Sequence, residues 1–547
     1  MQKTNSENVV FIYPTLIGIV AFFIVVGYPV VIPTNIAWLQ SDDLSTHFLG
    51  WHFFRFSDWV IPIGMNPDFG LEISNSIVFS DSNPLFAFVF KFLSPILPYP
   101  FQYFGIWILI SFILQAWFGW NLLRFLTRDS LIAALGAMLF TFSPPMLQFI
   151  TTHPSLGSHF LILASLFLVF KPDLRRRRLA WGVLLSTAAL VHAYLLAMAS
   201  LLWIADGLNR ITADNLKPRN FALEMLSIGI VLSLLLWQVG YFAIGSSVMA
   251  PGYGFYSANV LSLFDAEGWS YILGDIPRVE GQLGVSGFNF LGLGLILLLS
   301  AVIPVFFSNG VKFVPLLRRY SFLALALVLF AVFAISNRIG FGAYEIIIPI
   351  PEILQTMAET FRASGRMFWP VYYVIVFGIL YAVIRGFGKA AVLILSIAVV
   401  VQVVDTSAAW AEIRKRTSLE IGTGWKTNLS SPFWGEAAEK YENVRLLLPD
   451  NGHPNWRDLA YFAGMNQLAT DAVYLARVDR LALKVARERA VGTLRSGDYE
   501  PNTLYILDDD VVGRAVTNHI DMLTQIDGLN VLAPGWREGA DRESNAD

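Results

Sequence analysis

Four chemically distinct side chains recur at intervals of four residues near the start of the chain. The segment 40–55, QSDDLSTHFLGWHFFR, places Asp43, His47, Trp51 and Arg55 at successive i, i+4 positions, which lie on one ridge of an α-helix. At 1.5 Å per residue this ridge is about 18 Å long. It combines a carboxylate that could accept a proton, an imidazole, an aromatic face and a guanidinium that could bind an anion. We call residues 40–55 the ridge helix.

Phenylalanines cover much of the rest of the ridge helix, which predicts that it lies on a membrane surface with its polar ridge turned away from lipid. In the alternative interpretation the helix is an interfacial anchor whose charged groups only snorkel to water. Asp42 projects about 100° away from Asp43 around the helix, so both acids cannot do the same job.

The composition of the whole chain indicates an integral membrane protein. Of 547 residues, 55% are hydrophobic and 14% are charged, whereas soluble proteins carry roughly 25% charged residues. The net charge of −3 argues against a nucleic-acid-binding protein, which needs a basic surface. There is no cysteine, which excludes disulfides and thiolate metal sites. No histidine pair has HExxH spacing, so the sequence gives no support for a metal site or another cofactor.

Hydrophobic runs separated by charged or Pro/Gly-rich breaks predict about eleven membrane-spanning helices. The first run is too long for a signal-peptide core of roughly 7–15 residues. The fifth and sixth runs are short for a membrane that needs about 20 residues, so they could be half-helices or one bent span. The predicted spans are 9–34, 101–124, 130–150, 156–170, 179–191, 193–207, 221–244, 288–307, 320–336, 368–384 and 389–405.

The distribution of Lys and Arg predicts the orientation of these spans. With a cytoplasmic N-terminus, the inner loops hold sixteen Lys and Arg residues and the longer outer loops hold six. Joining the fifth and sixth spans into one would move the basic residues at 210–219 and 312–319 outside, so we expect two separate segments. The predicted membrane domain is then 1–405, with long outer loops at 35–100 and 245–287.

The tail, residues 406–547, is predicted to be a soluble domain outside the cytoplasm. The runs 444–449, 503–509 and 530–535 are typical of buried strands, and 480–494 has helical periodicity. Together these patterns predict a small α/β domain. Two acids, Asp508 and Asp509, end a predicted strand, a position where ligand residues often lie, although solvated turn acids are the simpler interpretation.

Further acidic and basic side chains follow in the first outer loop. Glu72 and Asp81 are candidate binding acids, and Lys91 is a candidate phosphate contact. Structural interpretations compete with these roles. The run SDSNP is typical of a helix that begins at Pro84 with Asn83 as its cap, and a lysine near the end of that helix suits the helix dipole.

Two histidines and two arginines complete the candidate set. His153 follows the third span, and His192 lies at the turn between the fifth and sixth spans. Such polar groups face a cavity or pack in the bundle interior. Arg362 and Arg366 have i, i+4 spacing, one helical turn apart, at the outer end of the tenth span. Gly365 beside them permits close approach of a ligand or backbone, and we expect it to leave room for a headgroup. Their guanidinium forks suit phosphate; snorkelling above an aromatic belt is the alternative.

The order of these parts resembles the GT-C superfamily of membrane glycosyltransferases. An acidic motif opens a long outer loop after the first helix, a bundle with short central helices follows, and an outer α/β domain ends the chain. The motifs that carry the resemblance to a bacterial group of this superfamily are D-x-x-x-HFLGWHFFR (43–55), FSDSNPL (79–85), FQYFG (101–105) and SGRMFWP (364–370).

This resemblance implies a polytopic α-helical protein of the bacterial inner membrane with a periplasmic C-terminal domain. Enzymes of the superfamily take a sugar from a polyprenyl phosphate or diphosphate carrier and pass it to an acceptor outside the cytoplasm. The partners it implies here are a polyprenyl-phosphate-linked sugar donor, membrane lipid, and a glycan or lipid acceptor of the cell envelope. No nucleic acid is expected.

The resemblance also implies residue roles. An acid of the first outer loop is the usual catalytic residue, and Asp43 matches that position best. It would act as the general base of an inverting displacement, with His47 binding the acceptor or the carboxylate. Arg366, followed by Arg55 or Lys91, would neutralise the leaving phosphate. The family's metal-binding residues cannot be placed in this sequence.

Two other function classes remain open. In a transporter or flippase for a lipid-linked sugar, the same charges would bind the substrate without chemistry. Inverted repeats would favour that function, and none is found. A non-catalytic scaffold for envelope assembly would leave the ridge of Asp43, His47 and Arg55 without a purpose.

Overall fold

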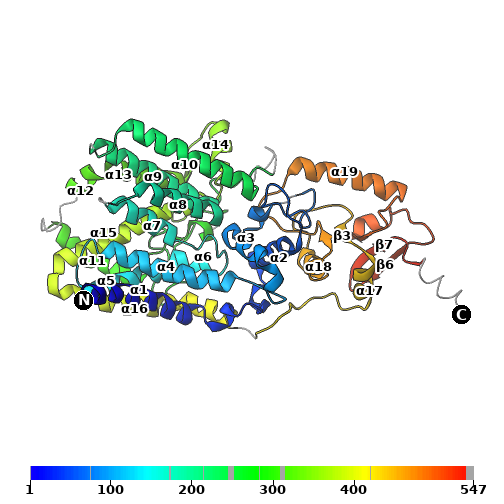
Figure 1. Cartoon of the computed structure of the whole chain (residues 1–547), viewed down its shortest axis with the longest axis horizontal. Coiled ribbons are helices and arrows are strands. Elements are labelled where there is room, and N and C mark those ends of the chain that lie inside the picture. Colours follow the sequence, from blue (N-terminus) through cyan, green and yellow to red (C-terminus); the bar gives the residue numbers. More distant parts are fainter. Residues whose placement is uncertain are drawn as a thin grey trace. The chain divides into compact units, whose positions relative to one another are not determined.

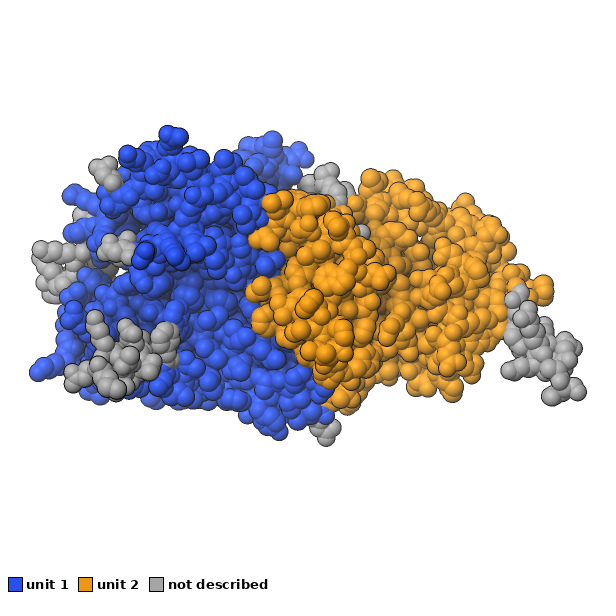
Figure 2. Space-filling view, viewed as in Figure 1, with its two compact units in different colours: residues 1–38, 102–233, 250–421 blue, residues 39–101, 234–249, 422–547 orange. Residues whose placement is uncertain are grey.

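The protein is described here by a computed structural model with two compact units (Figures 1 and 2). Unit 1 comprises residues 1–38, 102–233 and 250–421, and unit 2 comprises 39–101, 234–249 and 422–547. The structure describes residues 2–73, 76–171, 174–213, 215–243, 252–282, 284–307, 314–418 and 421–537, without the side chains of 2–11, 42, 306–307 and 314.

Unit 1 is helical apart from one antiparallel hairpin, β1–β2, within its described residues. Its helices are α1 (Gln2–Val25), α4 (Phe104–Leu123), α5 (Ser130–Thr141), α6 (Pro144–Ile150), α7 (Phe160–Phe170), α8 (Arg177–Val191), α9 (Ala193–Thr212), most of α10 (Pro218–Val239), α11 (Leu293–Phe307), α12 (Val314–Arg319), α13 (Ser321–Ile335), α14 (Glu352–Glu359), α15 (Trp369–Phe387) and α16 (Ala391–Thr417). The strands are β1 (Arg338–Phe341) and β2 (Tyr344–Ile347), and the short 3-10 helices are η1 (Tyr28–Val31), η2 (Ala37–Leu39), η5 (Gly284–Gly287), η6 (Ser364–Phe368) and η7 (Gly388–Ala390).

Three helical segments of the described chain are long and apolar enough to cross a membrane. They are α4, α10 and the continuous segment Ser364–Thr417, which contains α15 and α16. Helices α5 and α6, bent by 51° at the break between them, make a fourth if they are counted as one span. Length and composition therefore support a membrane-associated, mostly helical protein.

Every predicted span overlaps at least one helix, and the span 130–150 covers the bent pair α5 and α6. The lengths of the helices do not show eleven spans. Helices α7, α11 and α13 have 11, 15 and 15 residues, fewer than the roughly 20 residues that a helix needs to cross a membrane. The predicted break between the fifth and sixth spans is confirmed at His192, between α8 and α9. The predicted end of the membrane domain at residue 405 falls inside α16, which continues to Thr417.

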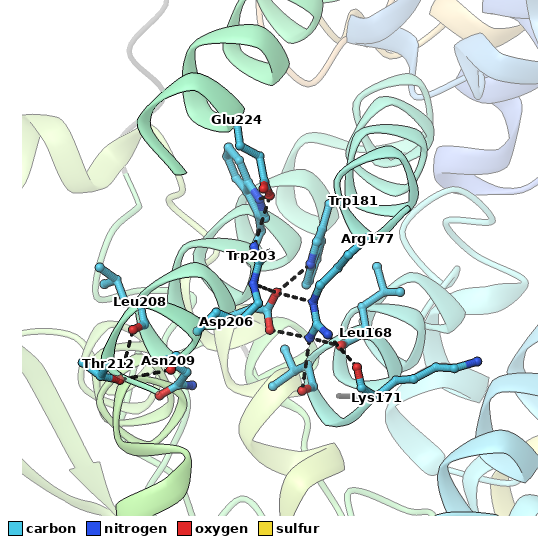
Figure 3. A network of polar contacts seen from close by, with 12 residues as sticks. Leu168, Lys171, Arg177, Trp181, Trp203, Asp206, Leu208, Asn209, Thr212 and Glu224 are labelled. Atoms are coloured by element: carbon cyan, nitrogen blue, oxygen red, sulfur yellow. Dashed lines mark hydrogen bonds and ion pairs between the residues drawn. The ribbon is translucent and has the colours of Figure 1, made fainter. Parts of the chain in front are cut away.

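A buried carboxylate joins α8 and α9 in unit 1 (Figure 3). Asp206 accepts both arms of Arg177, at 2.9 Å from Nε and 2.6 Å from Nη2. It also accepts the indole N–H of Trp181 at 2.9 Å, and Nε of Arg210 lies 3.2 Å away. Such bidentate guanidinium–carboxylate pairs are among the strong charge-assisted interactions.

A second carboxylate extends this cluster to α10. Glu224 accepts the indole N–H of Trp203 at 2.9 Å and pairs with Arg210 at 3.3 Å. Arg177 also donates to the carbonyls of Lys171 and Leu168 at the end of α7. Two arginines and two acids thus form a neutral, buried connection among four helices, which we call the charge cluster.

Unit 2 contains a five-stranded sheet with the order β4-β3-β5-β7-β6. Strands β4, β3 and β5 are parallel, and β7 and β6 run antiparallel to their neighbours. All five residues of β5 are buried, as expected of a central strand covered on both faces. The elements are α17 (Phe433–Lys440), β3 (Asn443–Leu446), α18 (Trp456–Met465), β4 (Ala469–Thr470), α19 (Arg480–Ser496), β5 (Thr503–Leu507), α20 (Asp509–Val512), β6 (Met522–Ile526) and β7 (Leu529–Ala533).

The predicted strands around 444, 503 and 530 and the predicted helix at 480–494 are therefore confirmed as β3, β5, β7 and α19. The α/β character of the C-terminal region is confirmed as well. The strands β4 and β6 were not predicted; β4 has only two residues, too few to give an alternating pattern.

The first long loop belongs to the same unit as the C-terminal domain. Its elements are α2 (Asp42–Phe56), η3 (Ile77–Ser80), α3 (Pro84–Phe92) and η4 (Ser94–Ile96). The loop extends the sheet, because Gly70 donates to the Thr470 carbonyl at 2.9 Å and Thr470 donates to the Asp68 carbonyl at 2.9 Å. Helix α2 packs on α18, where His52 bonds to the Gly464 carbonyl at 3.1 Å. The loop thereby covers the β4 edge, whose backbone groups would otherwise be unpaired.

Candidate functional site

The candidate base Asp43 lies in the first turn of α2. The helix follows Ser41, whose backbone is extended, and its first turn holds two acids, as favoured by the positive end of a helix dipole. Asp43 is half-buried, whereas every residue from Leu44 to Arg55 is buried. The side chain of Asp42 lies outside the described residues.

The other members of the ridge hold the loop together. Nδ1 of His47 lies 2.8 Å from the Ser80 carbonyl, and Nε1 of Trp51 donates to the Phe101 carbonyl at 2.9 Å. Because these side chains and the opposite face of α2 are buried in protein, the predicted surface helix on lipid is wrong, and so is the interfacial-anchor alternative. The ridge helix is a core element that positions Asp43.

Arg55 forms hydrogen bonds to the turn that follows α3. It donates to Ser94 Oγ at 3.0 Å, to the Pro98 carbonyl at 2.9 Å and to the Leu97 carbonyl at 3.1 Å. Burial lowers the pKa of its guanidinium. These donors already have protein acceptors, so the structure gives Arg55 a positioning function in place of the predicted phosphate contact.

Lys91, in the last turn of α3, is enclosed by aromatic rings. Its Nζ lies 4.1 Å from the ring centre of Phe54 and 4.6 Å from that of Trp59, and it donates to Ser57 Oγ at 3.2 Å and the Asp58 carbonyl at 3.3 Å. Burial lowers the pKa of the amine to about 8, against the opposing effect of nearby acids. This buried cation matches the structural interpretation, at the negative end of the α3 dipole.

The two remaining candidate acids of the loop are Glu72 and Asp81. Glu72 accepts Nη2 of Arg445 at 2.7 Å, and Nε of Arg445 lies 3.2 Å from Asp471, whose buried carboxyl has its pKa raised to about 6 by desolvation. Asp81 has a left-handed backbone at the end of η3 and is half-buried. The predicted start of α3 at Pro84 is confirmed, but the Asn83 side chain makes no cap hydrogen bond.

In unit 1, three of the candidate residues come together around two aromatic rings. The Arg366 guanidinium lies 5.4 Å from the ring centre of Phe149 and 5.2 Å from that of Tyr194. The ring of His153 packs against Phe149 at 6.0 Å, and the ring of His192 packs against Tyr194 at 5.6 Å. Arg366 is half-buried. We call these five residues the arginine cluster.

Local structure explains how the cluster is assembled. His192 caps α9, because its Nδ1 accepts the Tyr194 N–H at 3.1 Å. Tyr194 is fixed in turn by its hydroxyl, which accepts the Ala363 N–H at 2.9 Å just before η6. Helix α6 supplies Phe149, and η6 supplies Arg366. The break between α8 and α9 therefore places an aromatic ring against the arginine.

Two expectations about this segment are wrong. Arg362 and Arg366 do not share a helical face, because Arg362 precedes the 3-10 helix η6; its guanidinium lies 5.6 Å from the Tyr256 ring centre instead. Gly365 does not leave room for a headgroup either. A Cβ there would lie 2.6 Å from the Gly287 Cα, so this glycine permits close approach of backbone.

Sequence reasoning missed the aromatic partners of Arg366 and the buried His52. Phe149 and Tyr194 are distant in sequence from Arg366, and only the positions of helix ends, at Pro144-Pro145 and His192, hinted at their role. Within the part of the chain that the structure describes, no three His, Asp or Glu side chains are grouped so that they could hold a metal ion.

Residues 15–407 match the family model described as "Domain of unknown function (DUF6311)", and residues 433–534 match the model described as "DUF6311 C-terminal domain". The second match begins at the first residue of α17 and ends just after β7. No curated protein matches the chain.

Proposed function

We propose that this chain, which belongs to the DUF6311 family, is a membrane glycosyltransferase that moves a sugar from a polyprenyl phosphate or diphosphate carrier to a glycan or lipid acceptor. The observation that carries the proposal is the arginine cluster: a half-buried guanidinium between two aromatic rings, flanked by two histidines, in a unit rich in apolar helices. The architecture that resembles GT-C enzymes supports it. A guanidinium in an aromatic setting keeps its charge and offers a fork of donors to a phosphate.

The reaction is a single displacement with inversion. The acceptor oxygen forms a bond to the anomeric carbon and gives its proton to the Asp43 carboxylate. The bond between the anomeric carbon and the phosphate oxygen breaks, and its electron pair leaves on that oxygen. Arg366 stabilises the negative charge that develops there, with His153 and His192 as neighbouring hydrogen-bonding groups.

The membrane arrangement that suits this reaction is the one predicted from charge. The N-terminus is cytoplasmic, about eleven helices cross the bacterial inner membrane, and the first loop and the C-terminal domain lie in the periplasm. Sixteen basic residues in the inner loops against six in the outer loops support this orientation. That the first loop and the C-terminal domain form one unit supports their being on the same side.

The test is to compare Asp43→Asn with Asp42→Asn in membranes supplied with a lipid-linked sugar donor. Asparagine keeps the shape of aspartate but is not a base, so we expect Asp43→Asn to lower transfer by roughly 10²-fold or more at an unchanged protein level. Loss of transfer in Asp42→Asn alone would move the base by one residue. Normal transfer by both variants would remove the loop from the chemistry and favour a flippase that binds the same substrate.

A further inference from the structure

The sheet of unit 2 has a topological switch point between β3 and β5. From β3 the chain passes through α18 to β4 on one side, and from β4 it passes through α19 to β5 on the other side of β3. Because parallel crossovers are right-handed, the helices of these two crossovers lie on opposite sides of the sheet. The carboxyl ends of β3 and β5 are thus the place where open α/β sheets bind ligands.

A histidine and a carboxylate meet at these strand ends. His453, in the loop after β3, lies with Nε2 at 3.1 Å from Oδ1 of Asp508, the residue that follows β5. Nδ1 of His453 accepts the Asn455 N–H at 3.2 Å, so Nε2 carries the hydrogen that is donated to Asp508. The histidine side chain is only 10% exposed, but that of Asp508 is 46% exposed. The fixed imidazole therefore orients a carboxylate that remains open to a ligand.

An exposed aromatic ring packs against Gly452, the residue that precedes His453. Tyr474 is 47% exposed, and its ring packs on the backbone of Gly452, where a Cβ would lie 3.1 Å from the ring. Gly452 also has a positive φ of 92°, which glycine adopts without strain. The inner side of the ring contacts Trp456, with ring centres 5.8 Å apart. The Tyr474 ring is thus held against Gly452 and Trp456, which lie on either side of His453 in the sequence.

An open groove of about 400 Å³ runs along α19 and is lined by residues of that helix. One of them, Arg487, also donates to the Pro449 carbonyl at 2.7 Å and to Asp450 at 2.6 Å, in the loop after β3. Arg487 therefore fastens this groove to the loop that carries His453.

The same edge is linked to the candidate base. The hydroxyl of Thr46 donates to the Tyr474 carbonyl at 3.0 Å. Thr46 lies three residues after Asp43 on α2, and residues with this spacing have Cβ atoms about 5–6 Å apart. Asp43 and Tyr474 are accordingly neighbours within unit 2.

We propose that the strand ends around Tyr474, His453 and Asp508 form a glycan-binding site, which holds the acceptor beside Asp43. Sugars offer an apolar C–H face that stacks on an aromatic ring and hydroxyls that donate to carboxylates, and this edge presents one of each in fixed positions. The assignment of the bound glycan as acceptor rests on the proposed function. The binding itself does not, because it needs neither donor nor transfer.

The experiment measures glycan binding to the whole chain, purified in a detergent without a sugar headgroup and without lipid-linked donor. Saturation-transfer NMR is recorded with three probes: maltohexaose, chitohexaose and hexagalacturonate. We expect at least one probe to bind, with its affinity lowered 10-fold or more in Tyr474→Ala and in Asp508→Ala. The matched control is Tyr344→Ala, because Tyr344 is 80% exposed on β2 in unit 1; it should bind like the unaltered chain.

Two outcomes would overturn the proposal: none of the three probes binds, or a probe binds equally well in both variants. Thermal unfolding shows whether each variant is folded. Asp508 provides the second, exposed site of substitution in case Tyr474→Ala is unstable. If glycan binds as expected but Asp43→Asn still transfers sugar normally, the site stands as a glycan site and only the proposed catalytic role fails.

Discussion

The charge cluster of unit 1 allows a stability effect to be derived from individual contacts. Asp206→Asn keeps the side-chain shape but removes one buried negative charge and one of two acceptor oxygens. Both carboxylate oxygens of Asp206 are used, by Arg177 on each oxygen and by Trp181 on one of them. The amide nitrogen of asparagine therefore faces a donor that loses its acceptor (Figure 3).

The magnitude follows from what is left unpaired. A buried donor without an acceptor costs about 1–3 kcal/mol. Arg210 would still pair with Glu224, but Arg177 would lose its carboxylate partner in the cluster, and breaking a buried ion pair on one side costs about 3–5 kcal/mol in all. For a unit of this size, that corresponds to a fall in melting temperature of about 4–7 °C.

The assay is thermal unfolding in detergent followed by tryptophan fluorescence, since Trp181 and Trp203 donate directly to the cluster. The control is Glu412→Gln, the same chemical change in an exposed pair on α16, where Glu412 and Lys415 are 61% and 78% exposed and 3.7 Å apart. Such pairs contribute about 1 kcal/mol or less. Equal shifts of the melting temperature in Asp206→Asn and Glu412→Gln would refute the inference that the charge cluster stabilises the packing of α7, α8, α9 and α10.

Two further predictions concern single side chains. Arg366→Lys keeps the positive charge but loses the planar fork that fits both phosphate and the flanking rings, so sugar transfer should fall by about 10-fold or more at an unchanged protein level. Sugar transfer at the wild-type rate by Arg366→Ala would show that this residue has a structural role and does not bind phosphate. Burial lowers the pKa of His52 from 6.5 to about 4, so protonation favours the unfolded state. The stability contributed by neutral His52 is complete above pH 6.5 and falls by about 1.4 kcal/mol per pH unit down to pH 4. The free energy of unfolding of His52→Gln, measured from pH 7 to 4.5, should lack this decrease. The same dependence on pH in His52→Gln and in the unaltered chain would contradict the burial effect.

Local patterns in the sequence were sufficient to locate most elements. Hydrophobic runs gave the positions of the helices of unit 1, and the i, i+4 pattern gave α2 at 42–56 against the expected 40–55. What such patterns could not give is the partner of each buried face. Phenylalanines on α2 predict burial, but lipid and another protein segment are equally apolar, and the true partner, α18, lies some 400 residues later in the chain.

In the candidate site, too, local patterns located the segments but not the partners of their side chains. The types of residue at Asp43, His192 and Arg366 drew attention to the first turn of α2, the break between α8 and α9, and η6, since polar groups among apolar runs need a reason to be there. The roles of these residues stay predictions. Spacing alone misplaced the two arginines, because it assumes a regular helix where the chain forms the 3-10 helix η6. Gly365 illustrates how close approach of ligand and of backbone give the same sequence signal.

The burial of α2 has a consequence for the role of the C-terminal domain. A 15-residue helix in a loop cannot bury all of its faces by itself, and the groups that bury α2 include α18, whose Gly464 lies against His52 and Phe53. The polar ridge is used for the same purpose, as His47 and Arg55 bond to carbonyls of the loop. Of the α2 side chains that the structure describes, only Asp43 in the first turn and Phe56 at the end are not buried. The C-terminal domain is therefore part of the structure that holds the candidate base in place, and the Thr46–Tyr474 contact links the proposed glycan site to the start of α2, where Asp43 lies.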